Sequence, residues 1–253
     1  AIGEADLCGL ALVRAQAITA QSGAPVVNRP QAVLATGRSG NARRLTGLPG
    51  VRVPKIIELP RTAIEPTRLA RLGFPLLLRA PGFHMGRHFS LVETAEALDE
   101  AVAALPGETL MAIEYLDARG RDGLSRKYRA MIVDGILYPL HLAISRDWKV
   151  HYFSADMADR PEHRAEEAGF LAGLCSVGSG AVAALERIRD AIGLDYGGID
   201  FGLSAEGEIL LFEANATMIA ALPSPDAIWD YRRGPAQTVR AAARRMLAAR
   251  ALP

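Results

Sequence analysis

Two short apolar segments near the C-terminal end of the chain, residues 198–202 and 209–215, carry oxygen-bearing side chains. Each is predicted to be a strand, and the connection between them contains a turn glycine, which favours a hairpin. Pairing of the strands would place Asp200 alongside Glu213 and Asn215, and the last two are two residues apart and therefore share a face. Two carboxylates and one amide are suited to Mg²⁺ held together with the phosphates of a nucleotide.

A second group of residues, at the end of the apolar run 76–79, is suited to binding phosphate. Arg79 carries a planar guanidinium that can grip two phosphate oxygens at once. The loop that follows contains glycines, which let backbone N–H groups approach an anion closely. The loop residues with this chemistry are Gly82, His84, Gly86 and Arg87. The alternatives are a strand-end arginine paired with a surface carboxylate and an ordinary hairpin loop.

Four segments in a fixed order, within roughly residues 50 to 220, resemble the ATP-grasp superfamily. They are residues 73–82, 113–116, 128–135, and 193–201 with 212–215. In the order given they resemble the first nucleotide-binding strand and its loop, the adenine-contacting hinge, the strand and turn after the hinge, and the metal-binding strands. The third is similar to ligases that add glutamate to ribosomal protein tails, and the loop after Arg79 is similar to ATP-grasp domains attached to tetratricopeptide repeats. Arg79 stands where the superfamily usually has a lysine.

The resemblance implies an α+β fold of two lobes, with the nucleotide cleft between their sheets and most of the pre-ATP-grasp domain missing. The division it implies is a remnant of that domain with a linker over 1–60, a small lobe over 61–120, and a large lobe over 121–253 with the metal site and a C-terminal helix. The implied activity is that of an ATP-dependent ligase, which joins a carboxylate to an amine or similar nucleophile through an acyl phosphate. ATP and Mg²⁺ are the implied cofactors.

The resemblance also implies roles for individual residues. Mg²⁺ would be held by Asp200, Glu213 and Asn215. Phosphate charge would be offset by Arg79, Arg87 and Arg129, and the loop residues Gly82, His84 and Gly86 would cover the phosphates. Adenine or ribose would be contacted by Glu114, Tyr115, Leu116 and Asp117.

A basic cluster is expected beside the transferred phosphate. Lys127 lies two residues before Arg129, so the two face the same way on a strand, and the next segments contribute His141, Lys149 and His151. This charge fits a small-molecule or peptide carboxylate, and a solvated basic edge is the alternative. The arginines of the last helix, Arg240, Arg244 and Arg245 among them, are expected to form a solvated face.

The expected secondary structure alternates between strands and helices. Helices are expected over residues 4–21, 31–48 with interruptions near the glycines, 66–72, 94–105, 161–173, 179–192 and 235–252. Strands are expected over 25–30, 50–59, 76–79, 109–116, 126–134 and 136–145, before the hairpin at 198–215, and residues 83–92 are expected to contain a loop and then a further strand.

Composition narrows the class of protein. The chain has 253 residues, half of them hydrophobic, and a formal net charge of +1, which gives no reason to expect nucleic-acid or membrane partners. Its two cysteines have no metal-type spacing, and no signal peptide or membrane-spanning run is visible, so a cytoplasmic location is expected. The first residue is Ala1, as in a domain cut from a longer protein. Two other functions remain open, a kinase acting on a hydroxyl and a nucleotide-binding domain with little turnover.

Overall fold

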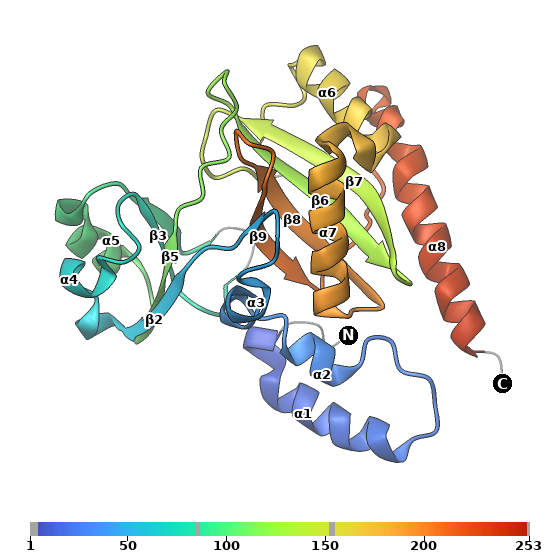
Figure 1. Ribbon diagram of the computed structural model, residues 1–253, viewed down its shortest axis with the longest axis horizontal. Helices are drawn as coiled ribbons and strands as arrows, with labels where there is room; N and C mark the ends of the chain where they lie inside the picture. The colour runs from blue at the N-terminus through green and yellow to red at the C-terminus, as the bar shows by residue number, and fades with distance from the viewer. Residues whose placement is uncertain (1–4, 84–86, 152–154, 252–253) are drawn as a thin grey trace. The chain divides into compact units, whose positions relative to one another are not determined.

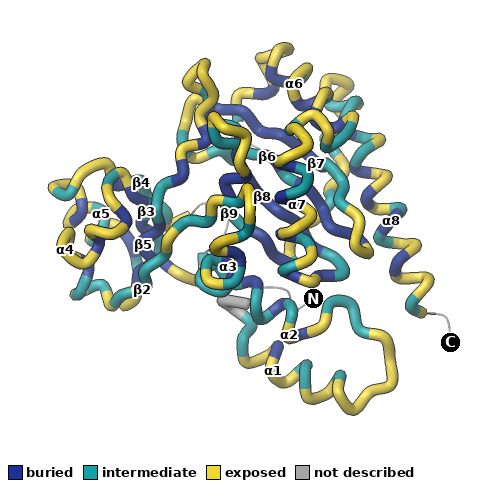
Figure 2. Tube along the Cα trace, viewed as in Figure 1, coloured by how far each residue is buried: buried dark blue, intermediate teal, exposed yellow. Residues whose placement is uncertain are grey.

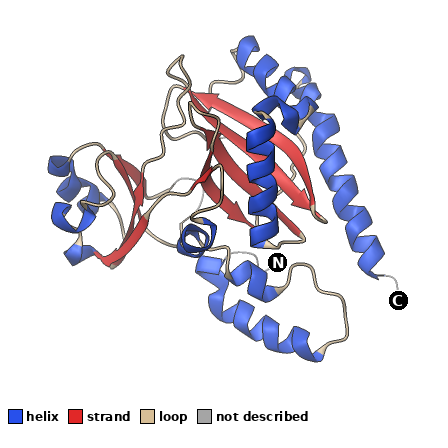
Figure 3. Ribbon diagram, viewed as in Figure 1, coloured by secondary structure: helices blue, strands red, loops and turns tan. Residues whose placement is uncertain are grey.

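The computed structural model describes residues 5–83, 87–151 and 155–251 (Figure 1). The chain divides into two compact units: unit 1 is Ala1–Arg52 with Ala118–Pro253, and unit 2 is Val53–Asp117. The boundaries expected from the sequence lay at residues 60 and 120, and the N-terminal 52 residues form one unit with the C-terminal part of the chain. Mixed helices and sheets in both units confirm the α+β class (Figure 3).

Unit 1 is built on a five-stranded sheet with the order β1-β9-β8-β6-β7. Its strands are β1 (Val51–Arg52), β6 (Ser125–Val133), β7 (Ile136–Ser145), β8 (Tyr196–Leu203) and β9 (Ile209–Asn215). β1 is parallel to β9 and every other pair is antiparallel. The central strands are buried over most of their length (Figure 2).

Two tight turns set the registers of this sheet. β6 and β7 are joined by Asp134 and Gly135, which both have positive φ (52° and 75°). Two residues of this conformation form a hairpin turn whose twist matches that of the strands, and Asp-Gly is a favoured sequence for it. In the β8–β9 hairpin, Gly207 has φ 82° and its N–H donates to the carbonyl of Ser204. The expected hairpins are therefore confirmed.

The helices of unit 1 are α1 (Ala5–Gln21), α2 (Pro30–Leu34), α3 (Arg38–Leu45), α6 (Pro161–Ala172), α7 (Ser179–Ile192) and α8 (Arg233–Ala251), with the short helices η3 (Leu174–Val177) and η4 (Ala227–Arg232). α3, α6, α7 and α8 pack against strands of the sheet, whereas α1 packs against α2. α8 buries Val239 and Met246 in a core cluster with Met131 and Val133 of β6. Because side chains alternate along a strand, Met131 and Val133 share their face with Arg129, so α8 covers one end of that face.

Unit 2 is a four-stranded antiparallel sheet with the order β2-β5-β3-β4. Its elements are β2 (Ile56–Pro60), η1 (Arg61–Ala63), α4 (Pro66–Leu69), β3 (Leu76–Arg79), β4 (Phe89–Val92), η2 (Ala95–Ala97), α5 (Leu98–Ala104) and β5 (Thr109–Glu114). Leu76, Leu78 and Leu110 are fully buried in its core, together with Leu69 of α4 and Leu98 of α5.

Most expected elements are confirmed to within a few residues, and two N-terminal expectations of strands are wrong in detail. Residues 25–30 form no strand, because Asn28 docks on β8 through its side chain: its Nδ2 donates to the carbonyl of Tyr196 at 2.7 Å, and its Oδ1 accepts from the Tyr196 N–H at 2.8 Å. The helical segment expected over 31–48 is confirmed as two helices, α2 and α3. The expected interruption falls at Gly37, the N-cap of α3, whereas Gly40 lies within α3.

The single strand expected over 50–59 is divided between β1 and β2, which belong to different sheets. Pro54 lies at the division, and a proline has no N–H to donate to a strand ladder. Among the described residues, no helix is long and apolar enough to cross a bilayer.

Candidate functional site

A row of polar residues crosses four adjacent strands of the unit 1 sheet. His141 of β7 is opposite Arg129 of β6, Arg129 is opposite Asp200 of β8, and Asp200 is opposite Glu213 of β9. Directly opposed residues project to the same face of a sheet. These four residues, called the polar row below, therefore form one line across the sheet.

The centre of the polar row is a two-fold hydrogen-bonded ion pair. Arg129 donates from Nε to Oδ1 of Asp200 at 2.6 Å and from Nη2 to Oδ2 at 2.7 Å. Lys127, two residues earlier on the same face, places Nζ 3.6 Å from Oδ2. Burial of Asp200 would raise its pKa, but the charges of Arg129 and Lys127 and the hydrogen bonds from Arg129 together hold that pKa well below its usual range. The carboxylate is therefore ionised at neutral pH.

Glu213 is held by a second arginine and by an amide. Arg38 of α3 places Nη2 3.0 Å from Oε1 of Glu213 and donates from Nη1 to the carbonyl of Phe212 at 3.3 Å. Asn215 donates from Nδ2 to the same Oε1 at 3.0 Å. The amide oxygen of Asn215 accepts from the N–H and the hydroxyl of Thr217, both at 2.9 Å. Asp200, Glu213 and Asn215 are thus brought together as the sequence predicted.

Irregular strand pairing aims the residues of the polar row. The register of β8 and β9 shifts after Asp200 and leaves Phe212 as the extra residue, and that of β6 and β7 shifts after Arg129 and leaves Leu140 as the extra residue. Such bulges bend a strand and redirect its side chains, and they are frequent beside active sites. The Phe212 carbonyl, released from the ladder, is the acceptor of the Arg38 hydrogen bond.

α3 is hydrogen-bonded to the C-terminal end of β9. Asn41 donates from Nδ2 to the carbonyl of Ala214 at 2.7 Å and to that of Thr36 at 3.0 Å. Arg38 and Asn41 lie three residues apart, on one side of α3. This helix therefore positions Glu213 through Arg38 and the end of β9 through Asn41.

The charges of this neighbourhood suit a metal–phosphate complex better than a bare ion. Asp200 and Glu213 are faced by the cations Arg38, Lys127 and Arg129, so the cluster carries a net positive charge before any ligand binds. Within the described parts of the chain, no group of three or more His, Cys, Asp or Glu side chains is placed to hold a metal. Mg²⁺ is commonly bound by one or two carboxylates together with substrate phosphates, and these residues fit that mode.

The other residues of the predicted basic cluster differ in exposure. His141 is buried, and burial and the positive charge of Arg129 lower its pKa well below the usual value. His151 is half-buried, and burial and the charges of Lys127, Arg129 and Lys149 lower its pKa as well. Both imidazoles are therefore neutral at pH 7, and the positive charge comes from the lysines and from Arg129. Lys149 is exposed and lies over the ring of Trp148 at 6.0 Å.

In unit 2, Arg79 at the end of β3 makes local contacts. Its Nη2 donates to the carbonyl of Phe83, and its guanidinium lies 5.7 Å from the centre of the Phe89 ring. The loop between β3 and β4 is closed by a hydrogen bond from the Ala80 N–H to the carbonyl of His88 at 3.0 Å. Arg79 thus braces the loop that was predicted to cover phosphate.

The other predicted nucleotide contacts of unit 2 lie on this loop and at the end of β5. Gly82 has φ 81° and Arg87 is exposed, while His84 and Gly86 lie outside the described residues. Glu114 ends β5, and its Oε2 accepts from the N–H of Lys55 at 3.0 Å. Beyond it, Tyr115 is half-buried, Leu116 is buried and Asp117 is exposed.

Sequence reasoning missed Arg38, Asn41 and Thr217. Thr217 could have been found, since it lies two residues after Asn215 and such side chains commonly bond nearby backbone and amide groups. Arg38 and Asn41 bond to groups 174 and 173 residues away. Their segment, Gly-Arg-Ser-Gly-Asn, carries no pattern that points to β9.

No protein-family model and no curated protein sequence matches the chain. Solved structures do match. D-alanine–D-alanine ligase from Bacillus anthracis, in complex with ATP, is similar with a TM-score of 0.59 and 13% identity over 94% of this chain and 74% of the other. A RimK-domain ATP-grasp protein from Sphaerobacter thermophilus is similar with a TM-score of 0.57 and 21% identity over 100% and 80%.

A third similar structure is the ATP-grasp ligase PsnB with a minimal precursor, Mg and ADP, with a TM-score of 0.50 and 17% identity over 90% of this chain and 66% of the other. These likenesses establish that the chain has the ATP-grasp fold.

Proposed function

We propose that this chain, which has the ATP-grasp fold, is an ATP-dependent ligase that joins a carboxylate to an amine or similar nucleophile. A carboxylate oxygen attacks the γ-phosphorus of ATP and ADP leaves, which gives an acyl phosphate. The nucleophile then attacks the acyl carbon, loses its proton and expels inorganic phosphate. The observation that carries this proposal is the polar row, which lines up Arg129, Asp200 and Glu213 on one face of the sheet.

The cations of unit 1 have a defined task in this reaction. The group to be phosphorylated is an anion and must approach a triphosphate that is already negative. Lys127 and Arg129, fixed against Asp200, offset that repulsion without reorganising, and such preorganised charge is a major source of rate acceleration. Arg129 is the residue of unit 1 that we assign to the transferred phosphate.

Asp200, Glu213 and Asn215 are the residues that would hold Mg²⁺. When bound, the ion would neutralise phosphate charge during transfer. Arg38 acts on this set as a positioning residue, because it fixes Oε1 of Glu213 and leaves Oε2 of that carboxylate outside the contact. Support also comes from two similar structures, which hold ATP in one case and Mg with ADP in the other.

In unit 2, we assign phosphate contacts to Arg79, Arg87 and the loop residues Gly82, His84 and Gly86. We assign adenine and ribose contacts to the segment from Glu114 through Tyr115 and Leu116 to Asp117. A nucleotide phosphate that displaced the Phe83 carbonyl would form a charge-assisted hydrogen bond with the Arg79 guanidinium. His141, Lys149 and His151, with Lys127, are assigned to the surroundings of the carboxylate substrate.

The test measures ADP release over a panel of carboxylates, amines and alcohols, with ¹⁸O-labelled carboxylates. Transfer of ¹⁸O into inorganic phosphate, and trapping of the intermediate by hydroxylamine, are the expected results. Arg129→Lys should slow turnover by roughly a hundredfold, because a lysine keeps the positive charge but lacks the planar guanidinium that donates two hydrogen bonds at once. The matched control is Arg126→Lys, since Arg126 also has a double contact with an aspartate, Asp122, and should change turnover little.

Phosphate left on an alcohol, without ¹⁸O transfer, would assign the chain to kinases instead. Firm ATP binding without turnover on any acceptor would make it a nucleotide-binding domain. Equal losses of turnover in Arg129→Lys and Arg126→Lys would contradict the role given to Arg129.

A further inference from the structure

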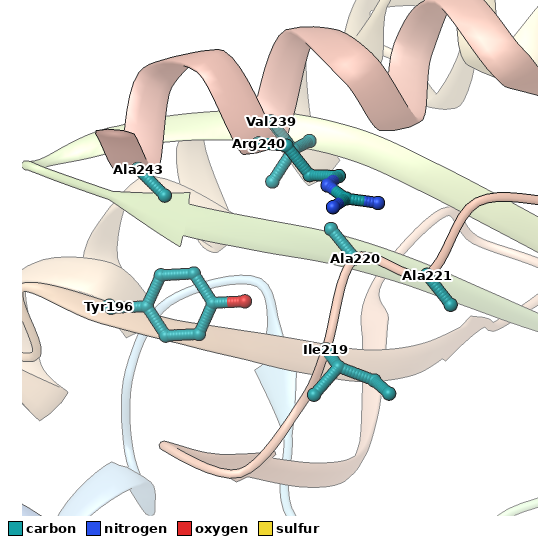
Figure 4. A pocket seen from close by; sticks show the side chains of 7 residues that line it. All are labelled: Tyr196, Ile219, Ala220, Ala221, Val239, Arg240 and Ala243. Atoms are coloured by element: carbon teal, nitrogen blue, oxygen red, sulfur yellow. The ribbon is translucent and has the colours of Figure 1, made fainter. Parts of the chain in front are cut away.

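A pocket of about 360 Å³ lies in unit 1 between the start of β8, the segment after β9 and one side of α8. Figure 4 shows its lining side chains, which are Tyr196, Ile219, Ala220, Ala221, Val239, Arg240 and Ala243. We call it the α8 pocket. Its volume is within the usual range for small-ligand sites, and no residue assigned above to ATP or Mg²⁺ lines it.

The lining of the α8 pocket combines apolar walls with one cation and one phenol. The walls are five aliphatic side chains, and the polar groups are Arg240 and Tyr196. Among the described residues, Arg240 has no salt bridge, whereas Arg250 near the end of the same helix bonds to Asp134 and Asp195. Arg240 therefore contributes positive charge to an apolar pocket, which is the chemistry that binds a carboxylate carrying an apolar group.

Tyr196 fixes one wall of the pocket. Its backbone is bracketed by Asn28, and its side chain lines the pocket together with Ala220. The segment after β9 carries exposed apolar residues, since Ile219 is 68% exposed and Leu222 is 44% exposed. The approach to the pocket is thus also apolar, which suits a ligand with an apolar chain.

The α8 pocket and the polar row share one face of the sheet. Tyr196 and Asp200 are four residues apart on β8 and therefore project to the same side, roughly 13 Å apart along the strand. Gly198 lies between them, and a Cβ there would meet Met218 Sδ at 2.6 Å, so Met218 packs directly over this position. Burial raises the pKa of Tyr196, and the positive charge of Arg129 partly offsets this rise.

This spacing decides which end of a substrate the pocket would hold. The pocket wall at Tyr196 lies roughly 13 Å along β8 from Asp200, so the pocket is separated from the place where a carboxylate would accept phosphate. It fits the far end of the nucleophile, whose amine would then lie nearer the polar row. The cations Lys127 and Arg129 lower the pKa of a nearby amine, and a neutral amine is the form that attacks an acyl phosphate.

We propose that the α8 pocket binds the C-terminal end of the nucleophilic substrate, a short peptide or peptide-like amine with an apolar last side chain. Arg240 binds its carboxylate, and Ala220, Val239 and Ala243 contact its side chain. The role in ligation rests on the proposed function, whereas the binding of such a ligand can be measured without ATP.

The probe is the dipeptide glycyl-leucine, titrated into the full chain by calorimetry or by NMR. Glycyl-leucinamide, which lacks the carboxylate, should bind at least tenfold more weakly. Arg240→Ala should weaken glycyl-leucine about tenfold, while the matched variant Arg244→Ala, one turn further on the same helix and exposed, should leave it unchanged. Ala243→Leu, which fills the pocket and keeps the arginine, should also weaken binding about tenfold.

The titration of Mg²⁺·ATP is carried out on the same variants, and Arg240→Ala should leave it unchanged. If Mg²⁺·ATP binds but the dipeptide does not, the α8 pocket assignment fails and the proposed function stands. If the dipeptide binds as expected but Mg²⁺·ATP does not, the proposed function fails and the pocket stands. Equal binding of the dipeptide and its amide, or equal effects of Arg240→Ala and Arg244→Ala, would overturn the proposal.

Discussion

The two units hold their phosphate-directed arginines in opposite ways. In unit 1, Arg129 is fixed by two hydrogen bonds to Asp200, a buried residue 71 positions away in the sequence. In unit 2, Arg79 is held by the carbonyl of Phe83, four residues further along its own loop. The first arrangement depends on the register of four strands, and the second depends on one local turn.

This difference predicts which substitutions should change both stability and ligand binding and which should change ligand binding alone. A residue of the polar row contributes to the fold and to the charge of the site at once, because it pairs with residues of other strands and because Asp200, at the centre of the row, is buried. Arg79 can exchange the neutral carbonyl of Phe83 for a phosphate oxygen. Substitutions in unit 1 should therefore change stability and ligand binding together, whereas substitutions at Arg79 should change ligand binding alone.

The largest effect is expected for Asp200→Asn. The change leaves Arg129 and Lys127 without their charge partner, and removal of one member of a buried pair typically costs about 3 kcal/mol. Urea denaturation of the variant should show this loss. Asp122→Asn is the matched control, because Asp122 also pairs with an arginine but has a side chain that is 46% exposed, and it should cost at most about 0.5 kcal/mol. Similar losses in both variants would show that the burial of Asp200 adds nothing to the stability that its pairing with Arg129 contributes.

Arg79→Ala is expected to weaken ATP binding by about 2 kcal/mol, which is roughly thirtyfold, and to leave adenosine binding and the unfolding midpoint unchanged. The reason is that the guanidinium would contact phosphate and not the base. Competition titrations with ATP and adenosine measure the difference. Arg68→Ala is the control in the same unit, since Arg68 is exposed and pairs with Glu65. A loss of stability in Arg79→Ala, with no change in ATP affinity, would give Arg79 a structural role instead.

A pH effect is expected from His141. Its pKa is lowered in the folded state, so the unfolded chain binds a proton that the folded chain does not, and stability is lost as the pH falls below about 6.5. Between pH 7 and pH 5 this loss is up to about 2 kcal/mol. His141→Gln should reduce the pH dependence of the free energy of unfolding over this range. An unchanged slope would show that His141 is protonated in the folded protein.

The smallest effect is expected for Arg38→Gln, which removes the charge beside Glu213. Because both side chains are partly exposed, the stability loss should be about 1 kcal/mol or less. The Mg²⁺ concentration needed for half-maximal ATP binding should change several-fold, since Oε1 of Glu213 is no longer held. Arg43→Gln, on the same helix, serves as the control. If only stability changes, Arg38 does not position Glu213 for metal.

Much of this arrangement could be predicted from sequence because it is local. Asp200 and Glu213 belong to one hairpin, and the turn at Gly207 fixes their pairing. The strand positions of Lys127 and Arg129 follow from alternation along β6. Each of these inferences needs only a short stretch of chain.

The rest could not be predicted because it depends on contacts between distant segments. Asn28 bonds to Tyr196 across 168 residues and replaces the expected strand. Arg240 is exposed, as expected for a solvated helix face, but its place in the lining of a pocket follows only from the packing of α8 over β6. No local pattern distinguishes Arg240 from Arg244, since both are arginines on an exposed side of one helix.

The central claim is that Asp200, Glu213 and Asn215 hold Mg²⁺ jointly with nucleotide phosphates. The most direct test is the titration of ATP into the wild-type chain and into Glu213→Ala, each with and without Mg²⁺. We expect Mg²⁺ to tighten ATP binding at least tenfold in the wild-type chain and to have little effect in the variant. Equal affinity in all four titrations would contradict the claim.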